Sequence, residues 1–460
     1  MPVNTISHLP GTTADSLPRP PPGPQGLPLI GSLIPFARDP LGFLTDCARR
    51  YGDVAAFRAG PQTMLILTHP DEIERVLVKE HGAFPKDRRF WRQVTAVFGN
   101  GLLTSQGDLW QRQRHLAASA FAGPKLAAYA EIMADATERT LDAWRTGEVR
   151  DLHVEMMALT LKIAARALFG TEADEDVAVM EAALDDVLGE IATRITRPFP
   201  IPDAVPLPGH LRYRRGLRRI EAIVARMIAE RRRSSSGTLN LLSALMNARH
   251  EDGSAMSDRQ LRDEVITFLL AGHETTALVL SWTIHLLGQH PDIDASLAAE
   301  ACEVLGGRSA GISDMPRLRL AERVVTESMR IYPPAWAFGR EARQDCVIGG
   351  YRVRAGTPIY ILPWIMHRDP RFFDEPEAFR PERWAGDLAR RLPRFAYMPF
   401  GGGPRICIGN RFAMIESVLI LASLVRRFRF VIPADRKVIP FPSMTLRLRG
   451  GLRARIAERL

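Results

Sequence analysis

Apolar residues recur every three or four positions over most of this chain, and two segments depart clearly from that spacing. Residues 54–67 (VAAFRAGPQTMLIL) and 351–362 (YRVRAGTPIYIL) alternate between apolar and polar side chains instead. Each segment is divided by a turn sequence, at Gly60 and at Gly356. Such alternation predicts β-strands, whereas the wider spacing predicts helices. We therefore predict a mainly α fold, with a large helical domain and a small β-rich part.

One predicted helix is unusually long. Ser257 and Gln260 have the spacing of a capping box, and apolar residues then recur at helical spacing until His290. This stretch of roughly 33 residues would be about 50 Å long and would cross a whole domain. Its middle, residues 271–276 (AGHETT), contains a glycine and two adjacent threonines, which weaken a helix. A weakened turn at the centre of a core helix usually indicates a functional site.

The ends of the chain and its cysteines set the expected organisation. Residues 1–26 are polar and then proline-rich, which predicts a flexible arm, and residues 27–460 contain no repeat or long linker, which predicts one domain. The first seventeen residues have no apolar run long enough for a signal sequence or a membrane span. The four cysteines are far apart and form no CxxC pair, as in a reduced compartment. We expect a soluble, cytoplasmic monomer without a transmembrane anchor.

The charge balance bears on partners and not on the fold. The chain has 61 Lys and Arg residues against 52 Asp and Glu residues, a net charge of +9. Acidic proteins, anionic lipids and nucleic acids are all attracted to such a surface. The arginine-rich runs at 212–219 and 231–233 lack the repeated exposed aromatic residues of a nucleic-acid surface, so we interpret them as solvated helix faces. We therefore expect no nucleic-acid partner.

Residues 400–409 (FGGGPRICIG) combine features that favour a metal-binding thiolate. Three consecutive glycines let the backbone approach a flat ligand closely. Cys407 stands just before a predicted helix, whose first amide groups and positive dipole end stabilise a thiolate. Arg405 adds positive charge and is able to bind an anionic group. A sulfur in this setting is a ready ligand for a soft metal.

This segment resembles the heme-binding loop of the cytochrome P-450 family, F-x-x-G-x-R-x-C-x-G, at all of its fixed positions. The resemblance covers nearly the whole chain and implies the fold of that family, a large helical domain with a small β-rich subdomain around a buried heme. It implies heme b as the cofactor and Cys407 as the ligand of its iron. It also implies that Phe400, Gly401, Arg405 and Gly409 contact the cofactor. Members with this proline-rich entry often have a membrane anchor, and we expect none here.

Trp110 and Arg114 match the W-x-x-x-R pair with which the family binds the heme propionates. Together with Arg405, they would neutralise two carboxylates through charge-assisted hydrogen bonds. Without the other motifs, the plain interpretation would be an interfacial tryptophan beside a surface arginine. The resemblance makes the propionate site the better hypothesis.

Glu327 and Arg330 match the E-x-x-R pair of the family, and their spacing puts them on one face of a helix. At that spacing, Glu and Arg usually form a solvated ion pair. Arg383, in the sequence PERW, would complete the buried Glu–Arg–Arg network of the family. The resemblance implies that this network braces the loop that leads to Cys407, which is a structural role.

Residues Ala271–Thr275 resemble the oxygen-activation motif of the family, A/G-G-x-E/D-T. The resemblance implies that Ala271 lies against the cofactor and that Thr275 holds a water or hydroperoxide hydrogen bond. It also implies that Glu274 relays protons inward. His273 before Glu274 suggests a zinc-binding HExxH motif, but position 277 is alanine, so we interpret His273 as an ordinary residue of the helix face.

The resemblance implies a monooxygenase that inserts one atom of O2 into an apolar molecule, by hydroxylation or epoxidation. No flavin or iron–sulfur unit is evident in the chain, so a separate ferredoxin or flavodoxin with an NAD(P)H-dependent reductase would supply electrons. This acidic partner would dock near Cys407, where Arg405, Arg411, Arg426 and Arg427 cluster in the sequence. The alternative, scattered solvated arginines, remains equally open.

The substrate pocket is expected to be formed by the segment before Trp110, by the long central helix and by the segment after residue 334. Any one of these side chains has core packing as its default role. Together they suggest a bulky apolar substrate such as a terpenoid, fatty acid, macrolide or steroid. The candidates are Phe90, Trp91, Val94, Phe98, Phe268, Ala271, Trp336 and Phe338.

Two rival interpretations keep the heme and change the function. A peroxide-using peroxygenase or a heme-thiolate isomerase would need no electrons from a partner, but such enzymes often lack the acid–alcohol pair that Glu274 and Thr275 form here. A non-catalytic heme sensor or carrier would have no use for a proton-delivery motif.

Overall fold

The computed structural model describes residues 18–170, 174–196, 201, 205–233, 240–249, 253–433 and 437–459. The chain divides into two compact units. Unit 1 consists of the residues up to Asp87 together with Ala337–Met366, and unit 2 consists of Arg88–Trp336 together with His367–Leu460. A single domain from residue 27 onward stays a prediction. Residues 1–17 of the expected arm lie outside the described residues.

Unit 1 contains both β segments that the sequence predicts. β1 (Val54–Ala59) and β2 (Gln62–Leu67) pair antiparallel across the turn at Gly60, as predicted. The second segment forms β6 (Tyr351–Val353) and β7 (Pro358–Ile361), but these two strands belong to different sheets. β7 is a central strand between β2 and β4 (Phe338–Glu341), whereas β6 pairs with β5 (Cys346–Ile348). Most of β7 is buried, so its backbone groups need hydrogen-bond partners on both edges of the strand. This need explains its central place in the sheet.

The rest of unit 1 consists of short helices and of the proline-rich entry. Two backbone hydrogen bonds attach that entry: the Arg19 carbonyl accepts from the Arg352 amide at 2.9 Å, and the Pro22 carbonyl accepts from the Ala56 amide at 2.8 Å. The helical elements are α1 (Leu33–Arg38), α2 (Pro40–Tyr51), α3 (Pro70–Glu74) and α14 (Pro363–Met366), with the turns η2 (Arg75–Lys79) and η3 (His81–Ala83).

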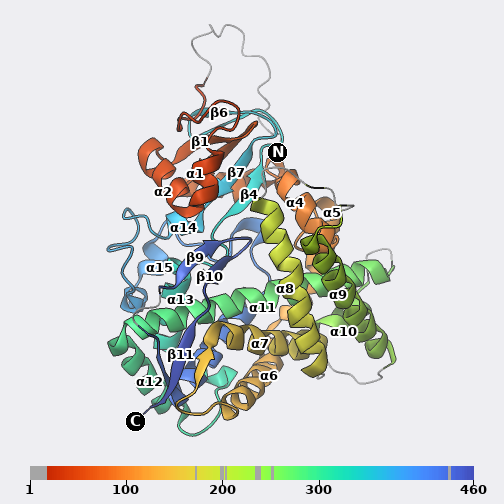
Figure 1. Cartoon of the computed structure of the whole chain (residues 1–460), viewed down its shortest axis with the longest axis vertical. Helices are drawn as coiled ribbons and strands as arrows, with labels where there is room; N and C mark the ends of the chain where they lie inside the picture. The colour runs from red at the N-terminus through yellow and green to blue at the C-terminus, as the bar shows by residue number, and fades with distance from the viewer. Residues whose placement is uncertain are drawn as a thin grey trace. The chain divides into compact units, whose positions relative to one another are not determined.

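Unit 2 is mainly helical, which confirms the predicted fold class (Figure 1). Its longer helices are α4 (Arg88–Phe98), α5 (Gly107–Ala118), α6 (Gly123–Asp142), α7 (Leu152–Ala164), α8 (Asp174–Thr196), α9 (Pro208–Arg233), α10 (Leu241–Asn247), α11 (Asp258–Gln289), α12 (Pro291–Leu305), α13 (Arg319–Ile331) and α16 (Asn410–Arg427). Shorter ones are α15 (Leu388–Arg391), η4 (Ser119–Phe121), η5 (Ala165–Phe169), η6 (Ile312–Asp314), η7 (Pro381–Ala385) and η8 (Gly403–Arg405).

Unit 2 also contains strands that the sequence analysis missed. A three-stranded sheet has the order β3 (Val149–Asp151), β11 (Arg453–Glu458) and β8 (Phe428–Val431). A two-stranded sheet pairs β9 (Ile439–Pro442) with β10 (Leu446–Arg449). The sequence LRLR of β10 alternates, and its leucines are more buried than its arginines. That alternation is the signal of a strand with one buried face.

Helix α11 has the bounds that the sequence predicts. The Ser257 hydroxyl accepts the amide of Gln260 at 3.2 Å, and His290 caps the other end. The helix continues without a break through residues 271–276, and it packs against α7, α13 and α16. Among the described residues it is the helix long and apolar enough to cross a membrane, but most of its apolar stretch is buried within the protein. It is therefore the core helix that the pattern predicted.

Candidate active site

The loop before α16 holds Cys407 in a fixed backbone conformation. Gly401 and Gly403 both have φ of +69°, in the left-handed region where a side chain is strained. The Cys407 amide donates to the Phe400 carbonyl at 2.9 Å and closes the loop. Gly409 then caps α16, and its carbonyl accepts the Ala413 amide at 2.8 Å. The glycines of the motif therefore set the turn that presents the cysteine just before the helix.

The Cys407 side chain is exposed, yet burial is the strongest influence on its pKa and raises it. The thiol is therefore accessible, although surrounding protein atoms are close enough to disfavour its charged form. The Gly409 amide and the positive charge of Arg114 act in the opposite direction and lower the pKa. The expected stabilisation of the thiolate is therefore present, but the cation that supplies it is Arg114 and not Arg405, and burial outweighs both contributions.

Trp110, Arg114 and Arg405 lie together beside this loop. The Arg405 guanidinium stacks on the Trp110 ring at 4.2 Å and donates to the Ser105 carbonyl at 3.2 Å. Arg114 donates to the Ile406 carbonyl at 2.7 Å. Burial and the charge of Arg114 lower the pKa of Arg405 to about 10. In the described part of the chain, neither arginine has a carboxylate partner, so this cluster has the charge to bind an anion.

The centre of α11 has a partly open face. Ala271 is exposed and Thr275, one turn later, is half-buried, whereas Leu269, Leu270 and His273 are buried. The Thr275 hydroxyl donates to the Ala271 carbonyl at 2.8 Å. The ring of His273 donates from Nδ1 to the Leu269 carbonyl at 2.9 Å, which agrees with our interpretation of it as an ordinary residue of the helix.

Glu274 is buried and bonded to the C-terminal strand β10. Its Oε1 accepts from the Thr445 hydroxyl at 3.0 Å and from the Arg447 Nε at 2.7 Å, and the Arg447 Nη2 lies 2.6 Å away. This ion pair was not predictable from the sequence, because it joins residues far apart in the chain. The structure therefore holds the Glu274 carboxylate against a guanidinium.

The structure brings Glu327, Arg330 and Arg383 together. Glu327 and Arg330 are fully buried and form two bonds of 2.8 and 2.9 Å, and Arg383 donates to the same carboxylate at 2.9 Å. The Trp384 indole and the Arg380 amide also donate to Glu327, at 2.8 and 3.0 Å. Arg330 donates in addition to three backbone carbonyls, those of His367, Pro376 and Ala378. Each charged side chain of this ion network therefore makes several hydrogen bonds.

Comparison with known proteins identifies the family. The family model described as Cytochrome P450 matches residues 21–452. The chain belongs to the cytochrome P450 family. Enzymes of this family are oxidoreductases that use heme b, O2 and electrons from redox partners to oxygenate apolar substrates, and this chain is such a monooxygenase.

Individual relatives agree with that assignment. A cyclooctatin synthase of Streptomyces melanosporofaciens is 38% identical over 426 residues, which are 92% of this chain and 92% of the relative. A pentalenene oxygenase of Streptomyces avermitilis is 35% identical and covers 95% of this chain and 97% of its own. The solved structure of a cyanobacterial P450, CYP120A1 with retinoic acid bound, has a TM-score of 0.86 over 96% of this chain and all of its own, at 24% identity. That structure confirms the P450 fold predicted from the sequence.

The residues around Cys407 fit the heme of a P450. The exposed Cys407 thiol would supply a sulfur ligand to the heme iron, and Arg114 and Arg405, which have no carboxylate partner among the described residues, would bind the carboxylates of the heme. The described residues contain no group of three His, Cys, Asp or Glu side chains able to hold a bare metal ion.

The predicted substrate-pocket residues of the P450 differ in their surroundings. Val94 and Phe98 of α4 are fully buried in the core of unit 2, so their immediate role is packing. Phe90 and Trp91 are half-buried and meet edge to face at 5.4 Å. Three candidates remain. Phe268 packs on Phe121 at 5.8 Å, Trp336 donates to the Ser443 carbonyl at 2.8 Å, and Phe338 is a half-buried residue of β4 in unit 1.

The arginines proposed to bind a redox partner do not form one exposed cluster. Arg405 is engaged with Trp110, as described above, and Arg411 is exposed. Arg426 and Arg427 are ion-paired with α6 instead, to Glu138 at 3.1 and 3.2 Å. Their sequence position near Cys407 is therefore not evidence for docking.

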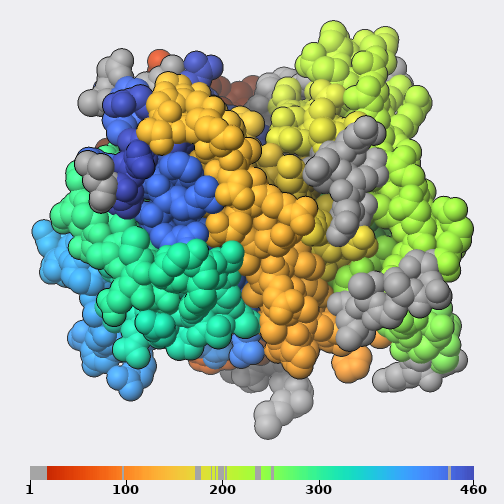
Figure 2. All heavy atoms as spheres, turned by 90° about the horizontal axis from the view of Figure 1, so that it is seen from below, coloured from red at the N-terminus to blue at the C-terminus, as the bar shows by residue number. Residues whose placement is uncertain are grey.

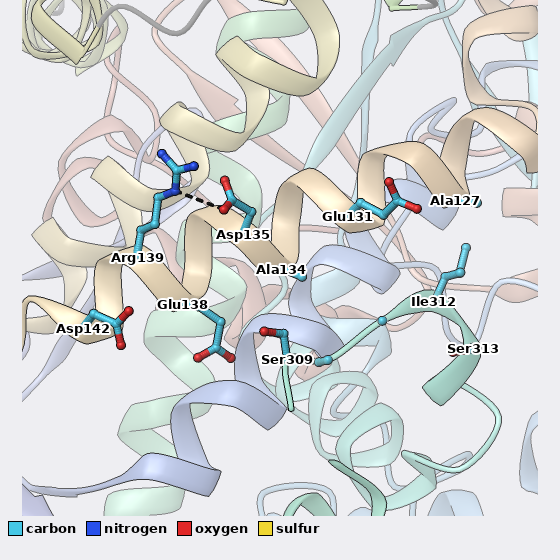
Figure 3. Close-up of a pocket in the computed structure, with 12 residues that line it drawn as sticks. Ala127, Glu131, Ala134, Asp135, Glu138, Arg139, Asp142, Ser309, Ile312 and Ser313 are labelled. Carbon is cyan, nitrogen blue, oxygen red and sulfur yellow. Dashed lines mark hydrogen bonds and ion pairs between the residues drawn. The ribbon is translucent and has the colours of Figure 1, made fainter. Parts of the chain in front are cut away.

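These ion pairs border an acidic groove of about 580 Å³ between α6 and residues 309–313. Figure 2 shows the face on which these two segments lie side by side. In Figure 3, Glu131, Asp135, Glu138 and Asp142 follow one another along α6, with Arg139 bonded to Asp135 at 3.0 Å. No lining residue belongs to the cysteine site, so we do not assign the catalytic chemistry to this groove.

Segment 99–105, between α4 and α5, is a part of the site that the sequence did not reveal. The Asn100 amide donates to Asp263 at 2.7 Å, and the Leu102 amide donates to Glu264 at 3.0 Å. At its other end, the Ser105 carbonyl accepts from Arg405. The segment therefore connects α11 to the loop of Cys407. Burial raises the pKa of Glu264 to about 8, although the Leu102 amide lowers it.

Proposed function

We propose that this P450 oxygenates a terpenoid, by hydroxylation or epoxidation, at a heme whose iron is bound by Cys407. One observation carries the assignment of the site: the exposed Cys407 thiol lies beside Arg114 and Arg405, neither of which has a carboxylate partner among the described residues. The substrate class is supported by the names of the relatives, a pentalenene oxygenase and a cyclooctat-9-en-7-ol 5-monooxygenase. The latter is 39% identical over 88% of this chain.

The residues of the loop and of α5 would hold the cofactor. Cys407 would bind iron as the thiolate, which the charge of Arg114 and the Gly409 amide favour. Arg114 and Arg405 would bind the propionates, with Trp110 holding the Arg405 guanidinium in place. The heme, when bound, supplies the activation of O2.

The residues of α11 would deliver protons. Thr275 donates its hydroxyl to the Ala271 carbonyl on the partly open face, and rotation of that hydroxyl would let it bond a water there. Glu274 would leave Arg447, take up a proton from solvent and pass that proton to this water. Arg447 thus belongs to the relay, because its guanidinium decides when the carboxylate is free.

A separate ferredoxin or flavodoxin with an NAD(P)H-dependent reductase would supply the electrons to a cytoplasmic monomer. The family uses redox partners, and the net charge of +9 attracts an acidic one. Arg411 supports docking near Cys407, because it is exposed and lies in the first turn of the helix that follows the loop. Glu327, Arg330 and Arg383 would brace the chain that leads to this loop.

Two measurements test the function. In the first, Cys407→Ser should abolish the red-displaced carbonyl band of thiolate-bound ferrous heme, whereas Cys302→Ser, which changes an exposed thiol on α12, should retain it. A Cys407→Ser protein that still has this band would refute the assignment of the ligand.

In the second measurement, a panel of cyclic terpenes, fatty acids, macrolides and steroids is screened for the high-spin shift of the Soret band. The hits are then incubated with a surrogate ferredoxin, its reductase, NADPH and O2, and the products are identified by mass spectrometry. We expect oxygenated terpenes. Turnover of steroids or fatty acids alone would overturn the substrate class.

A further inference from the structure

Glu416 is a buried acid without a role in the site described so far. It lies on α16, nine residues after Cys407 in the sequence, on a helix that packs against α6, α11, α12 and α13. Its side chain is 1% exposed, and neither carboxyl oxygen makes a well-formed hydrogen bond. Burial raises its pKa to about 8, and the hydroxyl of Thr276 lowers it. No charged residue of the packed helices is among the causes, so this acid is neutral near pH 7.

The hydroxyl of Thr276 on α11 lies next to this acid. The hydrogen bond that this hydroxyl donates to the backbone of its own helix is long. The hydroxyl donates to the Gly272 carbonyl at 3.2 Å. The same type of bond, from a hydroxyl to the carbonyl four residues earlier, measures 2.8 Å at Thr275 and 2.7 Å at Ser281 and Thr283 of the same helix. A hydroxyl has a single proton to donate, so Thr276 can serve either the Gly272 carbonyl or the carboxyl of Glu416.

The charge of Glu416 decides between these two acceptors. The neutral acid has a proton of its own and can donate to the Thr276 oxygen, which leaves the Thr276 proton for Gly272. The carboxylate is a stronger acceptor and draws the Thr276 proton to itself. The Gly272 carbonyl then loses its hydroxyl donor and keeps only the backbone amide of the helix. Because the carbonyl of Gly272 lies in the turn between Ala271 and Thr275, a water that replaces the lost bond would enter the proton-delivery region.

We propose that Glu416 is a positioning residue for proton delivery, which acts through Thr276 to decide whether the Gly272 carbonyl is held by a side chain or binds water beside Thr275. The inference rests on the proposed role of Thr275. It concerns a residue of α16 that lies outside the Cys407 loop. Glu416 of α16 would thereby influence the turn of α11 at residues 271–275, which is the proposed site of proton delivery.

Infrared spectroscopy of the ferric enzyme, without turnover, tests the contact itself. The carbonyl stretch of a neutral carboxylic acid should be present at pH 7 and should disappear with a midpoint near pH 8. Glu416→Gln should remove one such band, and Glu264→Gln, the matched control at a second buried acid, should remove a different one. Thr276→Val deletes the hydroxyl that lowers the pKa, so the midpoint of the Glu416 band should move to higher pH. A band that ignores Thr276→Val would overturn the proposal.

The ratio of product formed to NADPH consumed tests the function. In the wild type this ratio should decrease as pH rises, with about half of the loss reached near pH 8, where half of the Glu416 side chains are ionised. Glu416→Gln cannot ionise and should keep its pH 7 ratio at pH 9, whereas Glu264→Gln should retain the wild-type profile. Equal profiles in wild type and Glu416→Gln would refute the idea. Since the infrared bands and the carbonyl spectrum are measured independently, failure here is distinguishable from failure of the Cys407 assignment.

Discussion

The network around Glu327 permits a sharp prediction of stability. Glu327→Gln keeps the volume of the side chain but removes the negative charge that faces Arg330 and Arg383. Arg330 is fully buried, so its charge would remain in the interior without a counter-ion. Breaking a buried ion pair in this way costs about 3–5 kcal/mol. Three carbonyls still accept bonds from Arg330, which places the expected loss at the lower end, about 3 kcal/mol. That loss shifts the unfolding equilibrium more than about a hundredfold.

Urea denaturation of the heme-loaded enzyme measures this loss, with tryptophan fluorescence and the carbonyl band as separate probes. The matched control is Asp387→Asn, which breaks the exposed pair with Arg391 and should cost about 0.5 kcal/mol or less. We expect the carbonyl band of Glu327→Gln to be lost at lower urea than that of the control, because the network lies on the chain that leads to Cys407. If both variants unfold at the same urea concentration, the stabilising role assigned to Glu327 is wrong.

Three other outcomes follow from contacts in unit 2. Arg447→Leu leaves the buried carboxylate of Glu274 without its cation, so we expect a stability loss of about 2 kcal/mol and less product per NADPH; unchanged coupling would exclude Arg447 from the relay. Glu264 keeps its proton up to about pH 8 when folded but loses it near pH 4.3 when unfolded, so it makes stability decrease between these values by at most about 1.4 kcal/mol per pH unit. In urea titrations at several pH values, Glu264→Gln should therefore show a shallower decrease, and an identical slope would contradict the raised pKa. Arg114→Leu should lower the heme content of the purified enzyme and speed heme loss to an acceptor protein, while the exposed neighbour Arg112→Leu should have no effect.

Local patterns were enough to predict the elements whose signals lie within a few residues. The cap at Ser257 and the stop at His290 fixed the bounds of α11, and the turn at Gly60 fixed the first hairpin. A motif with fixed spacing located Cys407 before the fold was known. In each case the physical cause is a cap, a positive φ or a helix end. Such a cause acts on residues that are neighbours in the sequence, so a short sequence pattern reveals it.

Interactions between distant segments were not predictable in the same way. The pairing of Glu274 with Arg447 joins residues 173 positions apart, and the sequence LRLR that contains Arg447 was overlooked as a strand. The exclusion of Arg426 from a docking surface depends on Glu138, on another helix. Glu416 stood inside an unremarkable apolar helix, and only burial on all sides makes it notable. Tertiary packing decides which charged side chains pair with one another, and the periodicity of a single sequence does not predict that packing.

The attachment of segment 99–105 has a consequence for how such enzymes diversify. Its bonds to Asp263, Glu264 and Arg405 are all made by its backbone, so replacing the side chain of the exposed Asn100 or of the half-buried Leu103 would leave these three bonds in place. The other positions are restricted. Leu102, Thr104 and Ser105 are buried, and a Cβ at Gly99 or Gly101 would collide with Asp263 or with the Thr267 hydroxyl. Directed evolution of this stretch should therefore tolerate libraries at positions 100 and 103, with new substrate preferences gained at little loss of stability.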